Sequence, residues 1–341
     1  MSSWLSHVGW FHQLSPRSTP GDFWGIASAN QNDMDGAIRA ADAALKGVHV
    51  HGSISRYWCV GAKLRRNAWI DALRPNNLER FAAKGYSQYG ADGVLHKLFA
   101  DLGTQNKQYV EFGTGRGVET NTRRLREACG WSGLLMDIGY TDKRINLHRE
   151  FITRENIVQL FRKHRVPTEV DLLSVDINGN EWWVLEALLD QGFRPRVIVA
   201  EANLMLPEGV DHVLKYNSSF VWDRATLAQS CYIGSSALAF QRLARHYGYS
   251  TVLIYKPDIY LVRDTALADR GLAYQYTNDV PSLLRQANYN LSSTHPARTG
   301  LATICKMAYD ERGWTSAREL LAQRTAKDGK RNGTHLRRPG V

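Results

Sequence analysis

Short apolar runs alternate with longer segments of helical periodicity through the middle of the chain. The runs have the length and composition of buried strands, and they fall at 109–112, 133–137, 172–176 and 197–201. The helical patterns between them fall at 120–129, 154–164 and 181–191. This rhythm is typical of βαβ units, so it predicts an α/β fold with a doubly wound, mostly parallel sheet covered by helices on both faces. Two further strands, 251–255 and 259–262, are predicted to form an antiparallel hairpin beside that sheet.

The two ends of the chain lack this rhythm. Helical patterns without strand alternation cover 33–46, 54–73 and 78–83, and an amphipathic helix is predicted at 92–102, ended by Gly103. Beyond residue 264 the pattern is irregular, with one late helix near 316–323. We therefore expect a helical N-terminal extension at 1–86, a main domain at 87–264 and a C-terminal extension at 265–341.

Composition narrows the class of protein. A chain of 341 residues with 43% hydrophobic residues can bury a large core, which excludes a single small module. The four cysteines form no CxxC pair, so neither a zinc knuckle nor a disulfide scaffold is indicated, and we expect all four to be reduced. The apolar stretches are too short to span a bilayer, and the first residues make a poor signal peptide. These features predict a cytoplasmic protein without a membrane partner.

The formal net charge of +10 is concentrated toward the C-terminus, where basic residues outnumber acidic ones between Arg318 and Val341. The Gly and Pro content of this segment favours a solvated tail. A nucleic-acid partner bound through phosphate contacts is the less favoured alternative.

A glycine-rich segment, VEFGTGRGVETNT from Val110, directly follows the strand at 109–112. Its glycines are not spaced as GxGxxG, so a dinucleotide fingerprint is not indicated. Glu111 at the strand end would repel a pyrophosphate but suits a cation. These features favour S-adenosylmethionine, which carries a sulfonium and an ammonium group. Asp137 ends the next strand, where folds of this kind present a carboxylate to ribose hydroxyls.

Several blocks of the chain resemble, in order, the FkbM-like branch of class I S-adenosylmethionine-dependent methyltransferases. The blocks are SQYGADGVL from Ser87, VEFGTGRGVETNT from Val110, GWSGLLMDIG from Gly130, FITRENI from Phe151, DLLSVDINGNEWWVLEAL from Asp171 and PRVIVAEAN from Pro195. The resemblance implies a Rossmann-like sheet with an added antiparallel strand, and methyl transfer to a hydroxyl oxygen of a carbohydrate or a secondary metabolite.

The same resemblance implies a set of cofactor-binding residues. Those expected around the methionine and ribose are Gln88, Glu111, Gly113, Thr114, Gly115, Asp137 and Asp176. Phe151 and Ile152 are expected near the adenine, with ordinary core packing as the equal alternative.

Asp176 ends the predicted strand at 172–176, and Glu201 and Asn203 lie at the end of the predicted strand at 197–201. The three residues are expected to converge at the carboxyl edge of the sheet. Three oxygen ligands would suit Mg²⁺, as in catechol O-methyltransferase, which this arrangement resembles. In the slightly favoured alternative the site is metal-free, and Asp176 or Glu201 contacts the substrate directly and acts as the general base. All three residues are therefore candidate catalytic residues.

The leading interpretation is an O-methyltransferase with a small hydroxylated substrate. An RNA or cap methyltransferase is the first alternative, and a non-catalytic assembly protein that keeps the methyltransferase fold is the second. The segments at both ends could form a lid or the contact of a homodimer.

Overall fold

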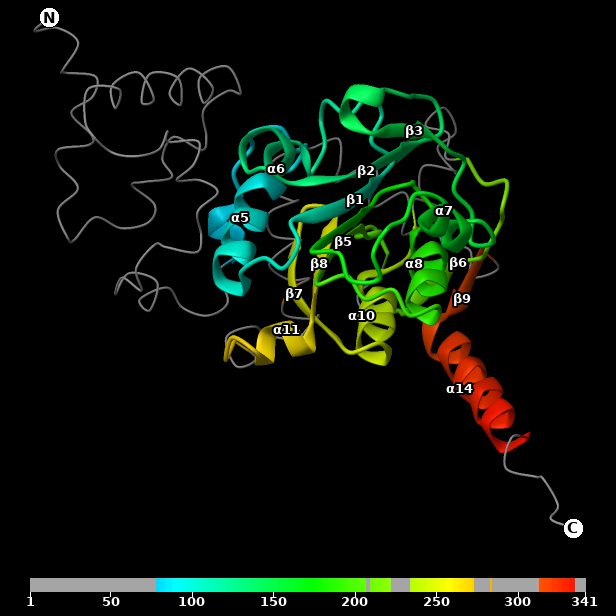
Figure 1. Ribbon diagram of the computed structural model, residues 1–341. Helices are drawn as coiled ribbons and strands as arrows, with labels where there is room; N and C mark the ends of the chain where they lie inside the picture. Colours follow the sequence, from blue (N-terminus) through cyan, green and yellow to red (C-terminus); the bar gives the residue numbers. More distant parts are fainter. Residues whose placement is uncertain (1–77, 207–208, 222–233, 273–282, 284–312, 335–341) are drawn as a thin grey trace, which may run out of the picture.

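The computed structural model describes residues 78–206, 209–221, 234–272, 283 and 313–334, and they build a three-layer α/β fold (Figure 1). Its centre is a seven-stranded sheet with the order β3-β2-β1-β4-β5-β8-β7. The strands of this sheet are β1 (Gln108–Phe112), β2 (Ser132–Asp137), β3 (Leu147–Arg149), β4 (Leu172–Val175), β5 (Val197–Glu201), β7 (Tyr249–Tyr255) and β8 (Asp258–Arg263). All pairs from β3 to β5 are parallel, while β8 runs antiparallel to both β5 and β7. The strand order is Rossmann-like, so the expected fold class is confirmed at this level.

Helices cover both faces of the sheet. One face is covered by η2 (Leu78–Phe81), α5 (Ala91–Leu102), α6 (Arg123–Ala128) and α11 (Asp264–Ala268). The other is covered by α7 (Ile157–Lys163), α8 (Glu181–Asp190), α10 (Ala237–His246) and α14 (Ala317–Thr334). A further short helix, η3 (Lys143–Ile145), lies between β2 and β3. Alternate residues of each strand point to opposite faces, and each of the two apolar cores collects one set.

The long apolar runs were predicted correctly, and the short strands were missed. The four predicted parallel strands correspond to β1, β2, β4 and β5, and the predicted hairpin corresponds to β7 and β8. The predictions did not include β3, β6 (His212–Leu214) and β9 (Trp314–Ser316), each of which has three residues. Three residues are too few to show a period of two, so only pairing with a neighbour identifies such strands.

The C-terminal extension packs against the main domain. β9 pairs antiparallel with β6, and Ala317 and Leu321 of α14 belong to the same core as α8 and α10. Arg324 on α14 forms an ion pair with the buried Glu186 of α8. The late helix is confirmed, and it extends to Thr334, beyond its predicted end at residue 323. As expected for a solvated segment, the exposed residues on it include Ala322, Gln323, Thr325 and Ala326.

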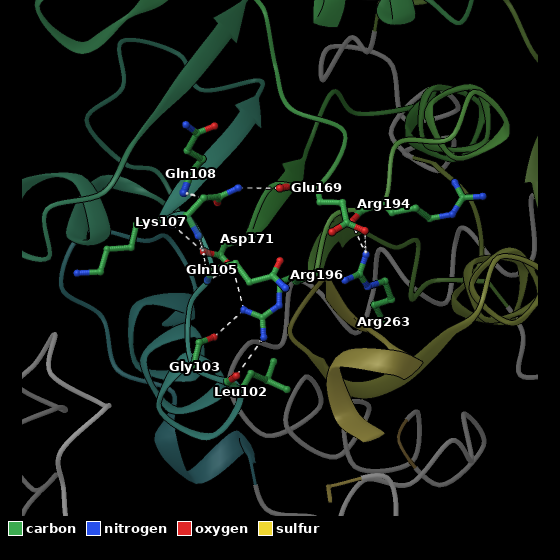
Figure 2. Close-up of polar contacts among 11 residues, drawn as sticks. Leu102, Gly103, Gln105, Lys107, Gln108, Glu169, Asp171, Arg194, Arg196 and Arg263 are labelled. Carbon is green, nitrogen blue, oxygen red and sulfur yellow. Dashed lines mark hydrogen bonds and ion pairs between the residues drawn. The ribbon is translucent and has the colours of Figure 1, made fainter. Parts of the chain in front are cut away.

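A buried ion pair between Asp171 and Arg196 stabilises the amino edge of the sheet (Figure 2). The side chain of Asp171, directly before β4, accepts hydrogen bonds from the backbone N–H groups of Gln105, Asn106 and Lys107. Its Oδ1 also lies 2.8 Å from the guanidinium of Arg196, which donates to the carbonyl oxygens of Gly103 and Leu102. Asp171 is fully buried, so this cluster connects α5, β1, β4 and β5 in the protein interior.

Three further expectations concern the rest of the chain. The predicted helices at 33–46 and 54–73 lie outside the described residues. Among the cysteines, Cys129 takes part in a disulfide bond, so the expectation of four reduced cysteines is wrong for this residue. In the described part of the chain, we find no helix with the length and apolar character needed to cross a bilayer.

Candidate functional site

Strand alternation places the candidate acidic residues on one face of the sheet. Glu111 follows Tyr109 by two positions in β1, and Asp137 follows Leu135 by two positions in β2. Tyr109 and Leu135 both belong to the core beneath α5 and α6. Glu111 and Asp137 therefore project toward the same face at the carboxyl edge, as the sequence interpretation required. Glu201 follows Val199 by two positions, and Asp258 precedes Tyr260 by two positions. Asp176 follows Leu172 by four positions. Leu172, Val199 and Tyr260 all belong to this core, so the three acidic residues project toward the same face.

Glu111 organises the turn between β1 and α6. Its carboxylate accepts hydrogen bonds from the backbone N–H groups of Asn121 and Thr122 and from the Thr122 hydroxyl, at 2.5 to 3.0 Å. These bonds fix the segment that leads into α6, where backbone donors have no helical partner. Glu111 thus has a structural role in addition to the negative charge it brings to the site.

Close backbone approach explains the first glycine of the turn. Gly113 has φ +67, and a Cβ at this position would lie 1.5 Å from the backbone carbonyl oxygen of Asp176. The tips of β1 and β4 therefore meet without space for a side chain. In Rossmann-like sheets, ligands bind outside the carboxyl ends of the strands near this point.

Asp137 connects the glycine-rich turn to the end of β2. One carboxylate oxygen accepts the N–H of Gly115, and the other accepts the N–H of Gly139, both at 2.7 Å. A carboxylate offers about four lone-pair sites, so Asp137 retains acceptors for a ligand hydroxyl. Thr114, between the two glycines, is buried, and its hydroxyl has no hydrogen-bond partner.

The other expected cofactor residues differ in exposure. Gln88 is exposed near the start of α5, whereas its neighbour Ser87 is buried and donates its hydroxyl to Asp92. Phe151 is 41% exposed, and Ile152 is 8% exposed within the core beneath α7 and α8. Core packing, the alternative considered for both residues, therefore describes Ile152 but not Phe151.

Three carboxyl groups come together beside the glycine-rich turn. Oxygen atoms of Asp176, Glu181 and Glu201 all lie within 4.8 Å of one another. Asp176 and Glu201 were expected to meet, and Glu181 was missed. Asn203 is buried, and its Oδ1 accepts a hydrogen bond from the N–H of Met205 at 3.0 Å.

The residues missed from the sequence are Glu181 and Asp258. Glu181 is the first residue of α8, and its carboxylate accepts hydrogen bonds from the N–H groups of Ile177 and Gly179. Asp258 begins β8, which is antiparallel, so the start of this strand lies beside the end of β5 opposite Glu201. The available signal for Asp258 was an acidic residue in the predicted turn, directly before the second strand of the hairpin.

Burial raises the pKa of several of these carboxyl groups. It raises the pKa of Glu111 to about 7 and that of Glu181 to about 8, because the charged form loses its hydration. Burial also raises the pKa of Asp176 and of Asp258, whose carboxyl lies near the charge of Asp176. Asp176 and Glu201 share a hydrogen bond, and the pKa of Glu201 is raised by burial and then by Asp176.

We call these six groups the carboxylate cluster: Glu111, Asp137, Asp176, Glu181, Glu201 and Asp258. None of the ion pairs formed within the described residues includes a member of it. A group of buried acids without a basic neighbour favours a positively charged ligand. Burial raises the pKa of most of these groups, so a cationic ligand would bind by favouring their charged form.

The raised pKa of Glu111 predicts a dependence of stability on pH. The folded chain keeps this proton up to about pH 7, whereas the unfolded chain releases it near the ordinary value of 4.5. The folded state binds more protons in this interval, so the free energy of unfolding should fall as pH rises through it. Urea unfolding at several pH values should show this fall, and Glu111→Gln should reduce it. An equally steep fall in the variant would contradict the assignment to Glu111.

Comparison of the chain with protein-family models and with curated proteins finds no match.

Proposed function

We propose that the protein is an S-adenosylmethionine-dependent methyltransferase that acts on a hydroxyl group of a small molecule, with a carbohydrate or a secondary metabolite as the acceptor class. The observation that carries the proposal is the carboxylate cluster without a basic partner at the carboxyl edge of a Rossmann-like sheet. S-adenosylmethionine carries a sulfonium and an ammonium group, so it supplies positive charge where these acids lack it. The FkbM-like sequence blocks support the same conclusion independently.

The turn between β1 and α6 would hold the nucleoside. Asp137 fixes Gly115 and keeps acceptors for ribose hydroxyls, while Gly113 lets the backbone approach closely. Phe151 and Ile138, both exposed at the ends of β3 and β2, offer apolar surface for the adenine. Glu111 would stabilise the cationic end of the cofactor in its charged form, which requires release of the proton that burial holds up to about pH 7.

Methyl transfer needs an acceptor oxygen in line with the methyl group and a base to take its proton. Asp176 and Glu201 are the candidates for that base, since both are partly exposed at the end of β4 and β5. Their shared hydrogen bond means that one of the two carries a proton when the other is charged. The charged partner could accept the hydroxyl proton as the oxygen attacks the methyl carbon. Asn203, beside Glu201 in sequence, remains a candidate for positioning the acceptor.

Incubating the full chain with methyl-labelled S-adenosylmethionine and a panel of hydroxylated acceptors tests this proposal. We expect label transfer to a carbohydrate or a phenolic or aliphatic alcohol, and loss of transfer in Asp176→Asn with Glu201→Gln combined. A chain that neither binds S-adenosylhomocysteine in calorimetry nor transfers label to any acceptor would overturn it and would favour a non-catalytic assembly protein.

An RNA substrate has less support, because several basic residues on α6 and α7 form ion pairs within the chain. Arg123 and Arg126 form ion pairs with Glu127, and Lys163 forms one with Glu150. Arg123 also lies over the ring of Tyr86. These contacts reduce the positive charge that α6 and α7 offer to phosphates.

A further inference from the structure

The carboxyl groups of Asp176, Glu181 and Glu201 have the mutual spacing of ligands around one small ion. Their nearest oxygens all lie within 4.8 Å of one another. Oxygen ligands that bind Mg²⁺ at about 2.1 Å, or Ca²⁺ at about 2.4 Å, are separated from each other by up to roughly twice those distances. The spacing therefore permits all three groups to contact an ion of the size of Ca²⁺ as they stand, and a smaller ion such as Mg²⁺ or Mn²⁺ once the side chains close by roughly half an ångström.

Rigid elements hold these three groups in place. Glu201 ends β5, Asp176 follows β4, and Glu181 begins α8. Three hydrogen bonds from the N–H groups of Ile177 and Gly179 fix the Glu181 carboxylate, at 2.7 to 3.0 Å. Gly234 lies against the same group, since a Cβ there would be 3.0 Å from Glu181 Oε2. The cluster is thus preorganised by the surrounding backbone.

A second observation indicates a missing ligand. The Oε2 atom of Glu201 is buried and has no hydrogen-bond partner. A buried carboxylate oxygen without a donor is costly, and a bound cation would satisfy it. The described residues place no lysine or arginine in an ion pair with any of the three groups.

We infer that Asp176, Glu181 and Glu201 together bind one divalent cation with a preference for oxygen ligands, such as Mg²⁺ or Mn²⁺. Glu181 takes the third position, which the sequence interpretation gave to Asn203. Asp176 and Glu201 are partly exposed, so water or an acceptor oxygen can complete the coordination. The inference deepens the proposed function, because the ion lies where the acceptor is proposed to bind, and its test does not depend on methyl transfer.

Mn²⁺ binding to the full chain, followed by electron paramagnetic resonance, tests the site. We expect the unmodified chain to bind one Mn²⁺, and Glu181→Gln and Glu201→Gln each to weaken binding at least about tenfold. Glu169→Gln is the matched control, because Glu169 is an exposed glutamate that pairs with Arg263 at the opposite edge of the sheet. Asn203→Ala should bind Mn²⁺ as the unmodified chain does.

The inference would be overturned if the unmodified chain did not bind Mn²⁺. It would also be overturned if Glu181→Gln and Glu201→Gln both bound Mn²⁺ as tightly as the unmodified chain. Weakening by Asn203→Ala with no effect of Glu181→Gln would also overturn it, in favour of the other ligand set. If Glu181→Gln does not fold, Glu201→Gln decides, because the amide has the size of the carboxyl group and can donate a hydrogen bond to Asp176 in its place. Calorimetry with S-adenosylhomocysteine in chelator-treated buffer separates the two proposals, since nucleoside binding without Mn²⁺ binding would overturn the ion site alone.

Discussion

Calorimetric titration of the Asp137→Ala variant with S-adenosylmethionine is expected to show an affinity at least about a hundredfold below that of the unmodified chain. The Asp137 carboxylate holds the N–H groups of Gly115 and Gly139, and it is the proposed acceptor for the ribose hydroxyls. Hydrogen bonds to a charged group contribute about 1.5 to 3 kcal/mol each, so the loss of one or two accounts for this factor. The glycine-rich turn would also lose its connection to β2.

Asp142→Ala provides the control for this experiment. Asp142 lies in the same connection between β2 and β3, and it forms an exposed ion pair with Arg144 instead of contacting the turn. We expect this variant to bind the cofactor as the unmodified chain does. Circular dichroism should show that both variants are folded. Unchanged affinity in Asp137→Ala would exclude this carboxylate from the cofactor site.

Asp171→Ala is expected to lower the free energy of unfolding by about 3 to 5 kcal/mol, the cost of leaving a buried charge without its partner. The substitution leaves the guanidinium of Arg196 and the backbone N–H groups of Gln105 and Lys107 without their acceptor. Lys107 has φ +52, a conformation that costs energy for a residue with a side chain, and the Asp171 carboxylate holds it there. Urea unfolding followed by tryptophan fluorescence measures the effect.

The double variant Asp171→Ala with Arg196→Met separates the buried charge from the lost hydrogen bonds. Arg196→Met removes the cation, so the double variant should be less destabilised than the two single effects added together. Additive effects would show that the ion pair itself contributes little and that the backbone hydrogen bonds of Asp171 dominate. Cofactor affinity should change little in any variant that remains folded, because this cluster lies at the amino edge (Figure 2).

The longest elements could be predicted from the sequence, because burial on both faces gives parallel strands a continuous apolar run. β4 and β5 have this pattern, and the helices between the strands follow it with a period near 3.6. Glu111 and Asp137 could be predicted as partners on one face, since both end strands that precede a turn. The three-residue strand β3 and the pairing of β6 with β9 could not, since they depend on neighbours distant in the chain.

By itself, the sequence determined the succession of strands and helices and the acidic residues that end the strands, because hydrophobic periodicity and turn residues act over a few positions. Only the tertiary structure decided which acids meet. Glu181 reaches Asp176 and Glu201 because α8 begins directly beside the ends of β4 and β5. Asp258 joins them because β8 runs antiparallel, which brings the start of that strand to the edge where the parallel strands end. Both placements depend on strand order and direction, which are set by packing between distant segments and not by any local pattern.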